Sequence, residues 1–379
     1  MDLIYIDPPY NTGNKDFRYN DNFVDKENGG RHTLWLSFMK TRLELAKELL
    51  KDTGVIFISI DDNEQANLKL LCDRVFKEEN WVGTFIWKSR QIVDSRNKNN
   101  VSNDHEYVLI FGKTQDVKLK GKLIDRGKYS NPDKDTRGAW MSNSILGLAN
   151  KDQRPNLHYD LIDPKTDLVY SCPPNTGWRY SRETMNEKIK DTRIVFPKSS
   201  DGRPREKKFL SEISSDFTGF STILSEDNGF TLNGTREVRD IVDSKQFSFP
   251  KPVALIQNIV NQTTDKDTPS VVLDFFAGSG TTGHAVLELN KQDGGRRQFI
   301  LVTNNEVTDK TQAQLRKDGK TEAEIHALGI CRSVTYPRLQ KVIEGYTTPK
   351  GDKVAGTGGK MRYYRTEYVE RSPNFDQQA

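Results

Sequence analysis

The sequence predicts an α/β fold, in which a sheet of buried strands carries helices on both of its faces. Short apolar runs alternate with amphipathic stretches over the first 112 residues, and the same alternation returns after residue 246. The segment between them is polar and irregular. Alternating strands and helices are typical of a sheet covered on both sides, and 379 residues are enough for two or three substructures.

In the first part of the chain, apolar runs at residues 3–6 and 55–60 predict two buried strands. Apolar residues recur at helical spacing between them, and Gly54 is placed to end that helix. The predicted apolar face consists of Leu36, Met39, Leu43, Ala46 and Leu49. The other elements predicted here are an amphipathic helix up to Phe76 and strands at 81–87 and 105–111.

The alternation resumes with a helix at 253–260 and strands at 271–275 and 298–303. Sheet, irregular insert and sheet again indicate one α/β domain that is interrupted in sequence. The expected parts are residues 1–112 and 246–345 for its two halves, 113–245 for the insert and 346–379 for a C-terminal tail.

Charge is unevenly distributed along the chain. The net charge is +4, but residues 113–210 hold 21 Lys and Arg against 13 Asp and Glu, a local excess of +8. A basic segment within a mildly acidic frame is typical of a polyanion-binding insert. The three cysteines are far apart and lack metal-ligand spacing, which indicates reduced thiols in a cytoplasm and no metal site. No apolar run is long enough for a membrane span.

The first predicted strand ends in the loop Asp7-Pro8-Pro9-Tyr10. Two prolines fix φ and remove two backbone donors, so we expect the carbonyl groups of this loop to remain uncommitted acceptors. With the carboxylate they suit a planar NH2 group, and the ring suits stacking on the heterocycle that carries it. The loop therefore predicts binding of an exocyclic amine of a nucleobase.

A glycine-rich loop follows the predicted strand 271–275. It contains Asp274, Phe276, Gly278, Ser279, Gly280, Thr281 and Thr282, and it opens a helical stretch. Glycines allow a ligand to approach the backbone closely, and a helix N-terminus favours a negative group such as a carboxylate. The spacing lacks the third glycine of a dinucleotide fingerprint and the Gly-Lys-Ser/Thr of a triphosphate site.

These two loops resemble motifs IV and I of the DNA amino-methyltransferases. Their order, with the acceptor loop first and a basic insert before the cofactor loop, is similar to the β class of that family. Further segments resemble the modification subunit of type III restriction systems, namely residues 32–39, 54–64 and 274–290. The resemblance implies a Rossmann-like S-adenosylmethionine-dependent methyltransferase fold with circularly permuted motif order, and a target-recognition role for the insert.

In that family a further strand and helix normally precede the acceptor loop. Here Met1 lies only six residues before Asp7. The resemblance therefore implies a shortened N-terminus, as in a fragment, or a missing part that is dispensable.

The resemblance also implies roles for the acceptor loop. Asp7 and the Pro8 carbonyl would each accept one hydrogen of adenine N6, and Tyr10 would stack on the flipped base. Pro9 completes this catalytic loop. Methyl transfer would then be direct, without a metal or a covalent enzyme intermediate, and would depend mainly on orientation.

On the cofactor side, the resemblance implies that Gly278 and Gly280 allow close approach of S-adenosylmethionine. Thr281, Thr282 and the helix N-terminus would hold its carboxylate, and Asp274 its ammonium group. Phe276 and Ser279 belong to the same loop. Glu306 is the candidate for the ribose hydroxyls, with Asn304 or Asn305 as alternatives, and Lys251-Pro252 would shape the pocket edge.

For double-stranded DNA, the candidate phosphate contacts are Lys88, Arg90, Arg96 and Lys98. The resemblance further implies a homodimer that recruits a separate restriction subunit with helicase and nuclease activity. Three alternatives remain open: cytosine N4 as the target, a non-catalytic DNA-recognition subunit, and methylation of RNA or of protein glutamine. Adenine is preferred over cytosine because family experience associates Asp in the first loop position with adenine.

Overall fold

The computed structural model describes residues 1–366 except 20–21, 26–28, 96–98, 243–246 and 308. The chain divides into two compact units. The larger unit comprises Met1–Lys120 and Phe220–Ala379, and the smaller unit comprises Gly121–Gly219. We describe each unit by itself.

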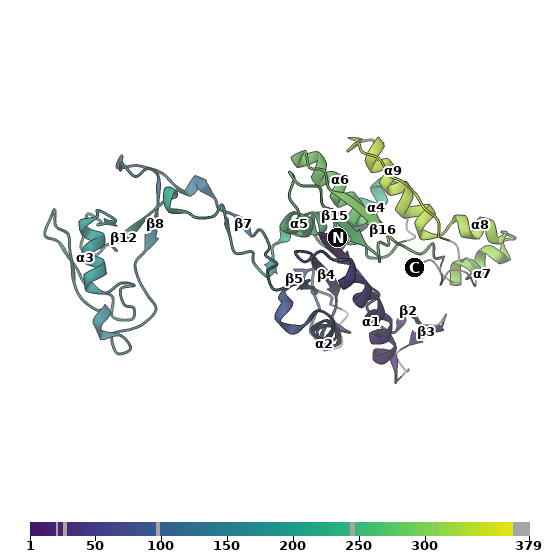
Figure 1. Ribbon diagram of the computed structural model, residues 1–379, viewed down its shortest axis with the longest axis horizontal. Helices are drawn as coiled ribbons and strands as arrows, with labels where there is room; N and C mark the ends of the chain where they lie inside the picture. The colour runs from purple at the N-terminus through teal and green to yellow at the C-terminus, as the bar shows by residue number, and fades with distance from the viewer. Residues whose placement is uncertain (20–21, 26–28, 96–98, 243–246, 308, 367–379) are drawn as a thin grey trace, which may run out of the picture. The chain divides into compact units, whose positions relative to one another are not determined.

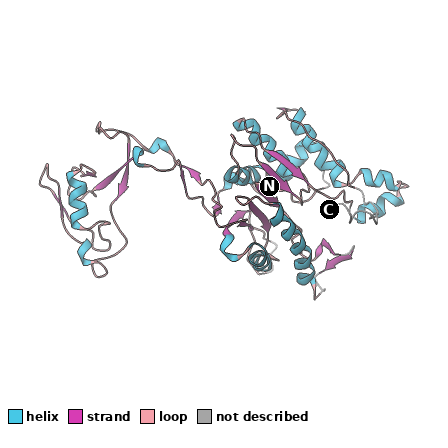
Figure 2. Ribbon diagram, viewed as in Figure 1, coloured by secondary structure: helices cyan, strands magenta, loops and turns pink. Residues whose placement is uncertain are grey.

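A seven-stranded mixed sheet forms the centre of the larger unit (Figures 1 and 2). Its strands, in spatial order, are β14 (Ile223–Leu224), β5 (Trp81–Lys88), β6 (His105–Gly112), β4 (Val55–Ile60), β1 (Leu3–Ile6), β15 (Val271–Asp274) and β16 (Gln298–Leu301). Neighbouring strands run parallel except that β6 is antiparallel to both β4 and β5. The predicted Rossmann-like α/β class is confirmed.

Helices cover both faces of this sheet. Helices α1 (Arg31–Leu49) and α2 (Gln65–Phe76) pack on one face, where the core includes Ile4 and Ile6. Helices α5 (Val253–Thr263) and α6 (Thr281–Asp293) pack on the other face, with Leu3 and Tyr5. Successive side chains of β1 thus enter opposite cores, as the period of two in a strand requires.

The apolar face predicted for α1 is wrong at its two ends. The structure buries Trp35, Met39, Leu43 and Ala46, whereas Leu36 is only partly buried and Leu49 is 51% exposed. Leu50, one residue beyond the helix, is buried in place of Leu49. At each end the buried residue lies four positions from its neighbour on the face (Trp35 from Met39, Leu50 from Ala46), where the prediction used a spacing of three; helical periodicity allows both.

Strands β1 and β15 are parallel neighbours, with Leu3 opposite Val272 and Ile4 opposite Leu273. The chain leaves β1 through α1 to reach β4, and it leaves β15 through α6 to reach β16, on the other face and in the other direction along the sheet. Open α/β sheets bind their ligands outside the carboxyl ends of the strands at such a switch point, and we call this place the crevice. The loops after β1 and after β15 both begin at this crevice.

The smaller unit is built from short elements around its own core. Its three-stranded sheet has the order β11 (Ile194–Val195), β12 (Arg205–Phe209) and β8 (Trp140–Ser144), and its helix is α3 (Arg182–Lys190). Two further pairs are β9 (Leu161–Ile162) with β10 (Val169–Tyr170), and β7 (Lys122–Leu123) with β13 (Phe217–Thr218). The core contains Ile145, Tyr159, Tyr170, Trp178 and Met185.

The smaller unit is shorter at both ends than the expected insert, 113–245. Residues 220–242 belong to the larger unit, because β14 extends its sheet and α4 (Thr231–Val242) packs on α9 (Tyr336–Glu344). The apolar runs in this stretch are short, so the sequence pattern did not distinguish them from the insert.

The C-terminal part of the larger unit contains α7 (Asp309–Lys317), α8 (Glu322–Ala327), a π-helical turn (Cys331–Thr335) and α9. Strands β17 (Gly345–Thr347) and β18 (Lys353–Ala355) then form a hairpin, so the expected tail boundary at 346 falls inside a strand. Near the N-terminus, β2 (Asn14–Tyr19) pairs with β3 (Asn22–Asp25).

Short 3-10 turns occupy Glu78–Asn80, Arg126–Lys128, Pro155–Leu157, Leu210–Glu212 and Glu226–Asn228. None of the helices within the described ranges combines the length and apolar character that crossing a membrane requires.

Candidate active site

The acceptor loop and the glycine-rich loop meet at one residue, Lys251. Its Nζ lies 2.8 Å from both carboxylate oxygens of Asp7. Its backbone carbonyl accepts a hydrogen bond from the hydroxyl of Thr281, at 3.2 Å. The two loops that the sequence singled out are therefore brought together, at the crevice between β1 and β15.

The shape of the acceptor loop is fixed from the α1 side. The indole Nε1 of Trp35 donates to the Pro9 carbonyl, at 2.7 Å. The expectation that the loop carbonyls stay uncommitted is thus wrong for Pro9. The Pro8 carbonyl receives no hydrogen bond from the residues that the structure describes, so it remains available as an acceptor.

Asn11 ends the acceptor loop with a positive φ of 57° and a fully buried side chain. Its amide donates to Glu64 Oε1, at 2.5 Å, and to the Arg31 carbonyl, at 3.3 Å. The Glu64 carboxylate also binds His32 Nδ1 and Asn67 Nδ2, at 2.7 and 2.8 Å. Asparagine is among the few non-glycine residues that tolerate the left-handed region. The hydrogen bond to the buried Glu64 carboxylate holds Asn11 in that conformation.

Two carboxylates share the ammonium group of Lys251. Glu106 Oε2, from β6, lies 3.3 Å from Nζ and accepts a hydrogen bond from the Tyr10 hydroxyl, at 2.8 Å. Burial raises the pKa of Asp7, and Glu106 adds to this, while Lys251 opposes it. Burial alone would lower the pKa of Lys251, but Asp7 and Glu106 outweigh it and raise that pKa, so the lysine is charged.

The Tyr10 ring is held in one orientation. Its hydroxyl is tethered to Glu106, and Nζ of Lys251 lies 5.0 Å from its centroid and 5.9 Å from that of Trp87. Burial and the neighbouring carboxylates raise the pKa of Tyr10 well above its ordinary value, so the phenol stays neutral. A neutral ring fixed at the edge of the crevice is suited to stacking.

The glycine-rich loop is braced by Asp274 at the end of β15. One carboxylate oxygen accepts from the Phe276 amide, at 3.0 Å, and the other from the Thr282 hydroxyl, at 2.5 Å. Burial raises the pKa of Asp274 to about 7. The hydroxyl hydrogens of Thr281 and Thr282 are both committed to protein acceptors, so only the backbone N–H groups of these two residues are left to bind a ligand.

Glycine is required at two positions of this loop. Gly278 and Gly280 have φ of 47° and 81°, a region that side-chain-bearing residues rarely adopt. A Cβ on Gly278 would lie 2.7 Å from the Phe247 ring, and one on Gly280 would lie 3.0 Å from Thr335. Gly280 also caps α6. The close packing leaves backbone amides, rather than side chains, at the helix start.

A fully buried arginine on α9 supports the same loop. The Arg338 guanidinium donates to the Ser279 carbonyl and hydroxyl, at 3.3 and 3.1 Å, and to the Thr281 hydroxyl, at 3.0 Å. Its other terminal nitrogen lies 3.1 Å from His284 Nδ1. Burial lowers the pKa of His284 to about 4, so the imidazole is neutral and accepts this bond. The charge of Arg338 thus orders the start of α6.

The remaining predicted site residues lie apart from this network. Glu306 is exposed, and its carbonyl accepts from the Ile330 amide, at 3.0 Å. Lys88 pairs with Glu226 at 2.9 Å, and Arg90 pairs with Asp94 at 2.7 Å. Arg96 and Lys98 lie outside the described residues. The ribose and phosphate roles of these residues stay predictions.

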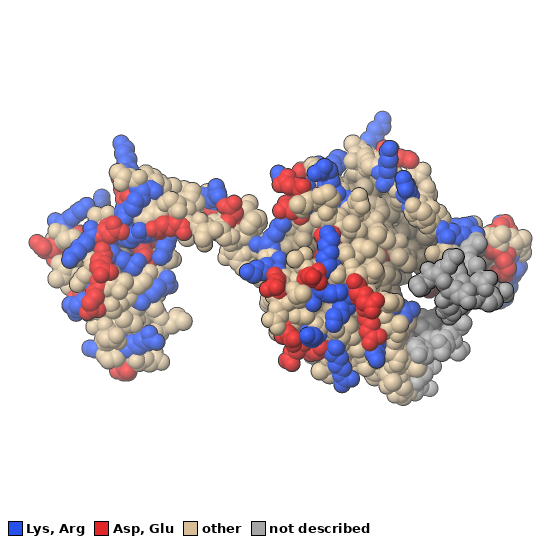
Figure 3. Space-filling view, in the orientation of Figure 1, with Lys and Arg blue, Asp and Glu red and all other residues tan. Residues whose placement is uncertain are grey.

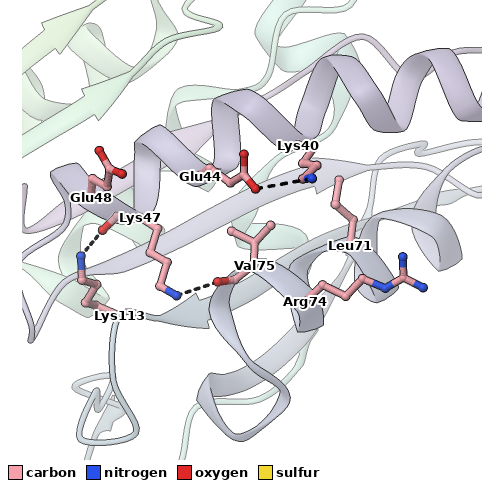
Figure 4. A pocket seen from close by; sticks show the side chains of 8 residues that line it. All are labelled: Lys40, Glu44, Lys47, Glu48, Leu71, Arg74, Val75 and Lys113. Atoms are coloured by element: carbon pink, nitrogen blue, oxygen red, sulfur yellow. Dashed lines mark hydrogen bonds and ion pairs between the residues drawn. The ribbon is translucent and has the colours of Figure 1, made fainter.

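A separate hollow of about 770 Å³ lies between α1 and α2, as Figure 4 shows. Several of its charged side chains are engaged with one another or with backbone: Lys40 pairs with Glu44, and Lys47 donates to the Val75 carbonyl. No residue of the two loops lines it. Across the described residues, no three His, Cys, Asp or Glu side chains are grouped to hold a metal ion.

Sequence reasoning missed the side-chain roles of Glu106, Lys251, Trp35 and Arg338. Lys251-Pro252 was expected to shape the pocket edge, but nothing in its neighbourhood showed that the ammonium reaches Asp7. Glu106, Trp35 and Arg338 lie in ordinary strand or helix patterns, so their sequence context carries no signal of its own.

The structure thus places the Asp7-Pro8-Pro9-Tyr10 loop beside the glycine-rich loop at the carboxyl ends of β1 and β15, where open α/β sheets bind their ligands. The chain belongs to the N6/N4 DNA methylase family, whose sequence profile matches residues 1–308. It is 35% identical to the StyLTI Mod subunit, a type III restriction-modification enzyme of Salmonella typhimurium, over 80% of this chain and 49% of that one.

Two other relatives are also named as a methyltransferase or a restriction-modification subunit. Identity is 36% with the type II methyltransferase M.KpnI of Klebsiella pneumoniae, over 82% of this chain and 77% of the relative. Identity is 32% with the type III EcoPI Mod subunit of Escherichia phage P1, over 95% of this chain and 61% of the relative. The chain thus spans about half to three quarters of the length of these relatives.

The raised pKa of Asp274 predicts a stability that falls with pH. The folded protein holds this proton up to about pH 7, whereas an unfolded aspartate loses it near 3.8, so rising pH destabilises the fold between these values. Asp274→Asn removes this dependence. Between pH 5 and pH 8 the variant should gain about 3 kcal/mol of unfolding free energy relative to the parent. Denaturant unfolding at both pH values measures this, with Asp265→Asn as an exposed control, and an equal difference at both would contradict it.

Replacing Arg338 should loosen the glycine-rich loop. Arg338→Met removes the charged donor from Ser279 and Thr281, which should cost about 2–3 kcal/mol of stability. Amide hydrogen exchange over residues 278–284 should speed up. Arg316→Met, which removes an exposed arginine bonded to Glu322, is the matched control. Unchanged exchange in the first variant would show that the loop holds its shape without the guanidinium.

Proposed function

We propose that this chain is a site-specific DNA methyltransferase that transfers a methyl group from S-adenosylmethionine to adenine N6 in double-stranded DNA. The observation that supports it is the bridge through Lys251, which places the Asp7 carboxylate and the Thr281 end of the glycine-rich loop on either side of one residue. The similarity to StyLTI and EcoPI Mod subunits supports a role as the modification subunit of a type III restriction-modification system.

The acceptor loop has the groups that an amine requires. The Asp7 carboxylate and the Pro8 carbonyl would each accept one hydrogen of N6, and Tyr10 would stack on the base. A base in a duplex must be flipped out to reach them, at a cost of a few kcal/mol. Stacking on the fixed ring, worth about 1–3 kcal/mol, offsets part of that cost.

The glycine-rich loop would hold the cofactor, because its two left-handed glycines add no side chain of their own at the start of α6. The first-turn N–H groups of α6 would bind the methionine carboxylate. Asp274 would bind the ammonium group through the lone pairs that Phe276 and Thr282 leave free. S-adenosylmethionine supplies an already activated methyl group, so the protein's own task is to orient the amine. Glu306 remains the candidate for the ribose.

The smaller unit would recognise the DNA sequence. It holds 18 Lys and Arg against 14 Asp and Glu, a basic excess that supports this role, and Figure 3 shows side chains of both signs on its surface. Lys88, Arg90, Arg96 and Lys98 would contact phosphates. We further infer a homodimer, a restriction subunit as partner and action in the cytoplasm, as the Mod subunit relationship suggests.

Asp7→Asn tests the acceptor assignment. The amide keeps the shape of the side chain but loses the charge and one acceptor, so methyl transfer should fall at least about 100-fold. Binding of S-adenosylmethionine, measured by calorimetry, should change less than about threefold. Asp73→Asn, which alters a carboxylate paired with Lys69 on α2, is the control and should methylate normally. Full activity of Asp7→Asn would refute the assignment.

Long-read sequencing of DNA from a host that expresses the chain distinguishes adenine methylation from cytosine methylation and from a non-catalytic subunit. N6-methyladenine in one sequence context supports the proposal, and N4-methylcytosine supports the cytosine alternative. Unmodified DNA together with no binding of S-adenosylmethionine would instead indicate a non-catalytic recognition subunit.

A further inference from the structure

Lys251 is a buried cation between two carboxylates that come from distant parts of the chain. Its side chain is 8% exposed, that of Glu106 is 17% exposed and that of Asp7 is 27% exposed. Asp7 is the most accessible of the three, so it is the member that a ligand in the crevice meets. Lys251 and Glu106 are less accessible to it.

The contact between Lys251 and Asp7 leaves Asp7 free to act. The ammonium lies 2.8 Å from both carboxylate oxygens and occupies one lone pair on each. Each oxygen of an ionised carboxylate has a second lone pair, which can accept a hydrogen bond from an amine. Such a symmetric contact also fixes the rotation of the carboxylate.

The Lys251 side chain is held in its position, so a ligand does not displace it from Asp7. Prolines on both sides restrict its backbone, and its carbonyl is bonded to Thr281. Glu106 and the rings of Tyr10 and Trp87 surround Nζ on its other sides. A lysine that left this position would strand two carboxylates in a buried place, which is costly.

The charges of the three groups sum to one negative charge. This net charge acts on the methyl-transfer step, which rests on the function proposed above, because a positive charge forms on the amine during that step. The amine nitrogen uses its lone pair to form the bond to the methyl carbon, the sulfur–carbon bond breaks, and its electron pair stays on sulfur. The nitrogen becomes positive until one hydrogen leaves as a proton to the Asp7 carboxylate, which passes it to solvent.

A positive charge that develops beside Asp7 is stabilised by a negative site and opposed by a free lysine. We propose that Lys251 and Glu106 are positioning residues that set the charge of Asp7: Lys251 keeps the carboxyl group ionised and oriented, and Glu106 cancels the charge of the lysine. One net negative charge then faces the amine. Glu106 also holds the Tyr10 ring through its hydroxyl.

The two residues act on Asp7 in opposite directions, and this provides the test. Lys251→Met removes the charge that favours ionised Asp7, and Glu106→Gln removes the one that disfavours it. Other titratable groups that face Asp7 or Glu106 are the same in every variant, namely Tyr5, Tyr10, Asp61 and Asp274. Differences between variants therefore report on the exchanged pair.

The experiment is the pH dependence of single-turnover methylation with the full chain and a DNA that carries its recognition site. The acidic limb should move up by about one to two pH units in Lys251→Met and down by about one unit in Glu106→Gln. Each plateau rate should fall at least about tenfold. Lys69→Met, which removes a partly buried lysine paired with Asp73 on α2, should leave the profile unchanged.

The double variant tests whether the two substitutions compensate each other. Lys251→Met with Glu106→Gln again leaves one negative charge, so its acidic limb should return to within about half a unit of the parent and its plateau should exceed that of either single variant. Additive losses, or limbs that move together, would overturn the proposal. Lys251→Arg should restore part of the plateau, since it restores the charge.

A readout without methylation separates this inference from the proposed function. The carboxyl carbon of Asp7, followed by ¹³C NMR in labelled protein, should titrate at higher pH in Lys251→Met and at lower pH in Glu106→Gln. If these shifts occur but the parent methylates no DNA, the proposed function fails and the charge network stands. If the parent methylates DNA and the shifts are absent, the network fails alone.

Discussion

The parallel pairing of β1 with β15 is the constraint on which the site depends. Because the two strands are neighbours, and because α1 and α6 carry the chain away over opposite faces, both strand ends open into one crevice. Residues near position 7 and near position 280 thereby become neighbours without any long loop. A sheet with another strand between these two would hold the same motifs too far apart to act on one pair of ligands.

Buried charge organises this crevice on both sides. Lys251 serves the acceptor loop and Arg338 serves the glycine-rich loop, and each is nearly or completely removed from water. Such burial is unfavourable unless several hydrogen bonds replace the lost hydration. Each cation here meets that condition, since it binds acceptors on the loop that it supports. The conformations of the loops consequently depend on residues distant in the chain as well as on their own glycines and prolines.

The sequence was informative where chemistry is local. Apolar runs ending in Asp7 and Asp274 marked both loops, and the structure brings them together. It was uninformative where function depends on chain-distant contacts: Lys251 is 244 residues from Asp7 along the chain, and Arg338 is 59 from Ser279. The insert boundary failed for a related reason, because β14 and α4 join the larger unit through packing that their short apolar runs do not reveal.

The way the chain enters and leaves the smaller unit has an evolutionary consequence. Both crossings pass through the short antiparallel pair β7 and β13, where Gly121 lies against Thr218, while the smaller unit keeps a core of its own. A module attached by one two-stranded stem can be exchanged by recombination at that stem. Under the recognition role that we propose for the smaller unit, replacing its roughly one hundred residues as a cassette changes the target sequence and leaves both loops of the larger unit in place.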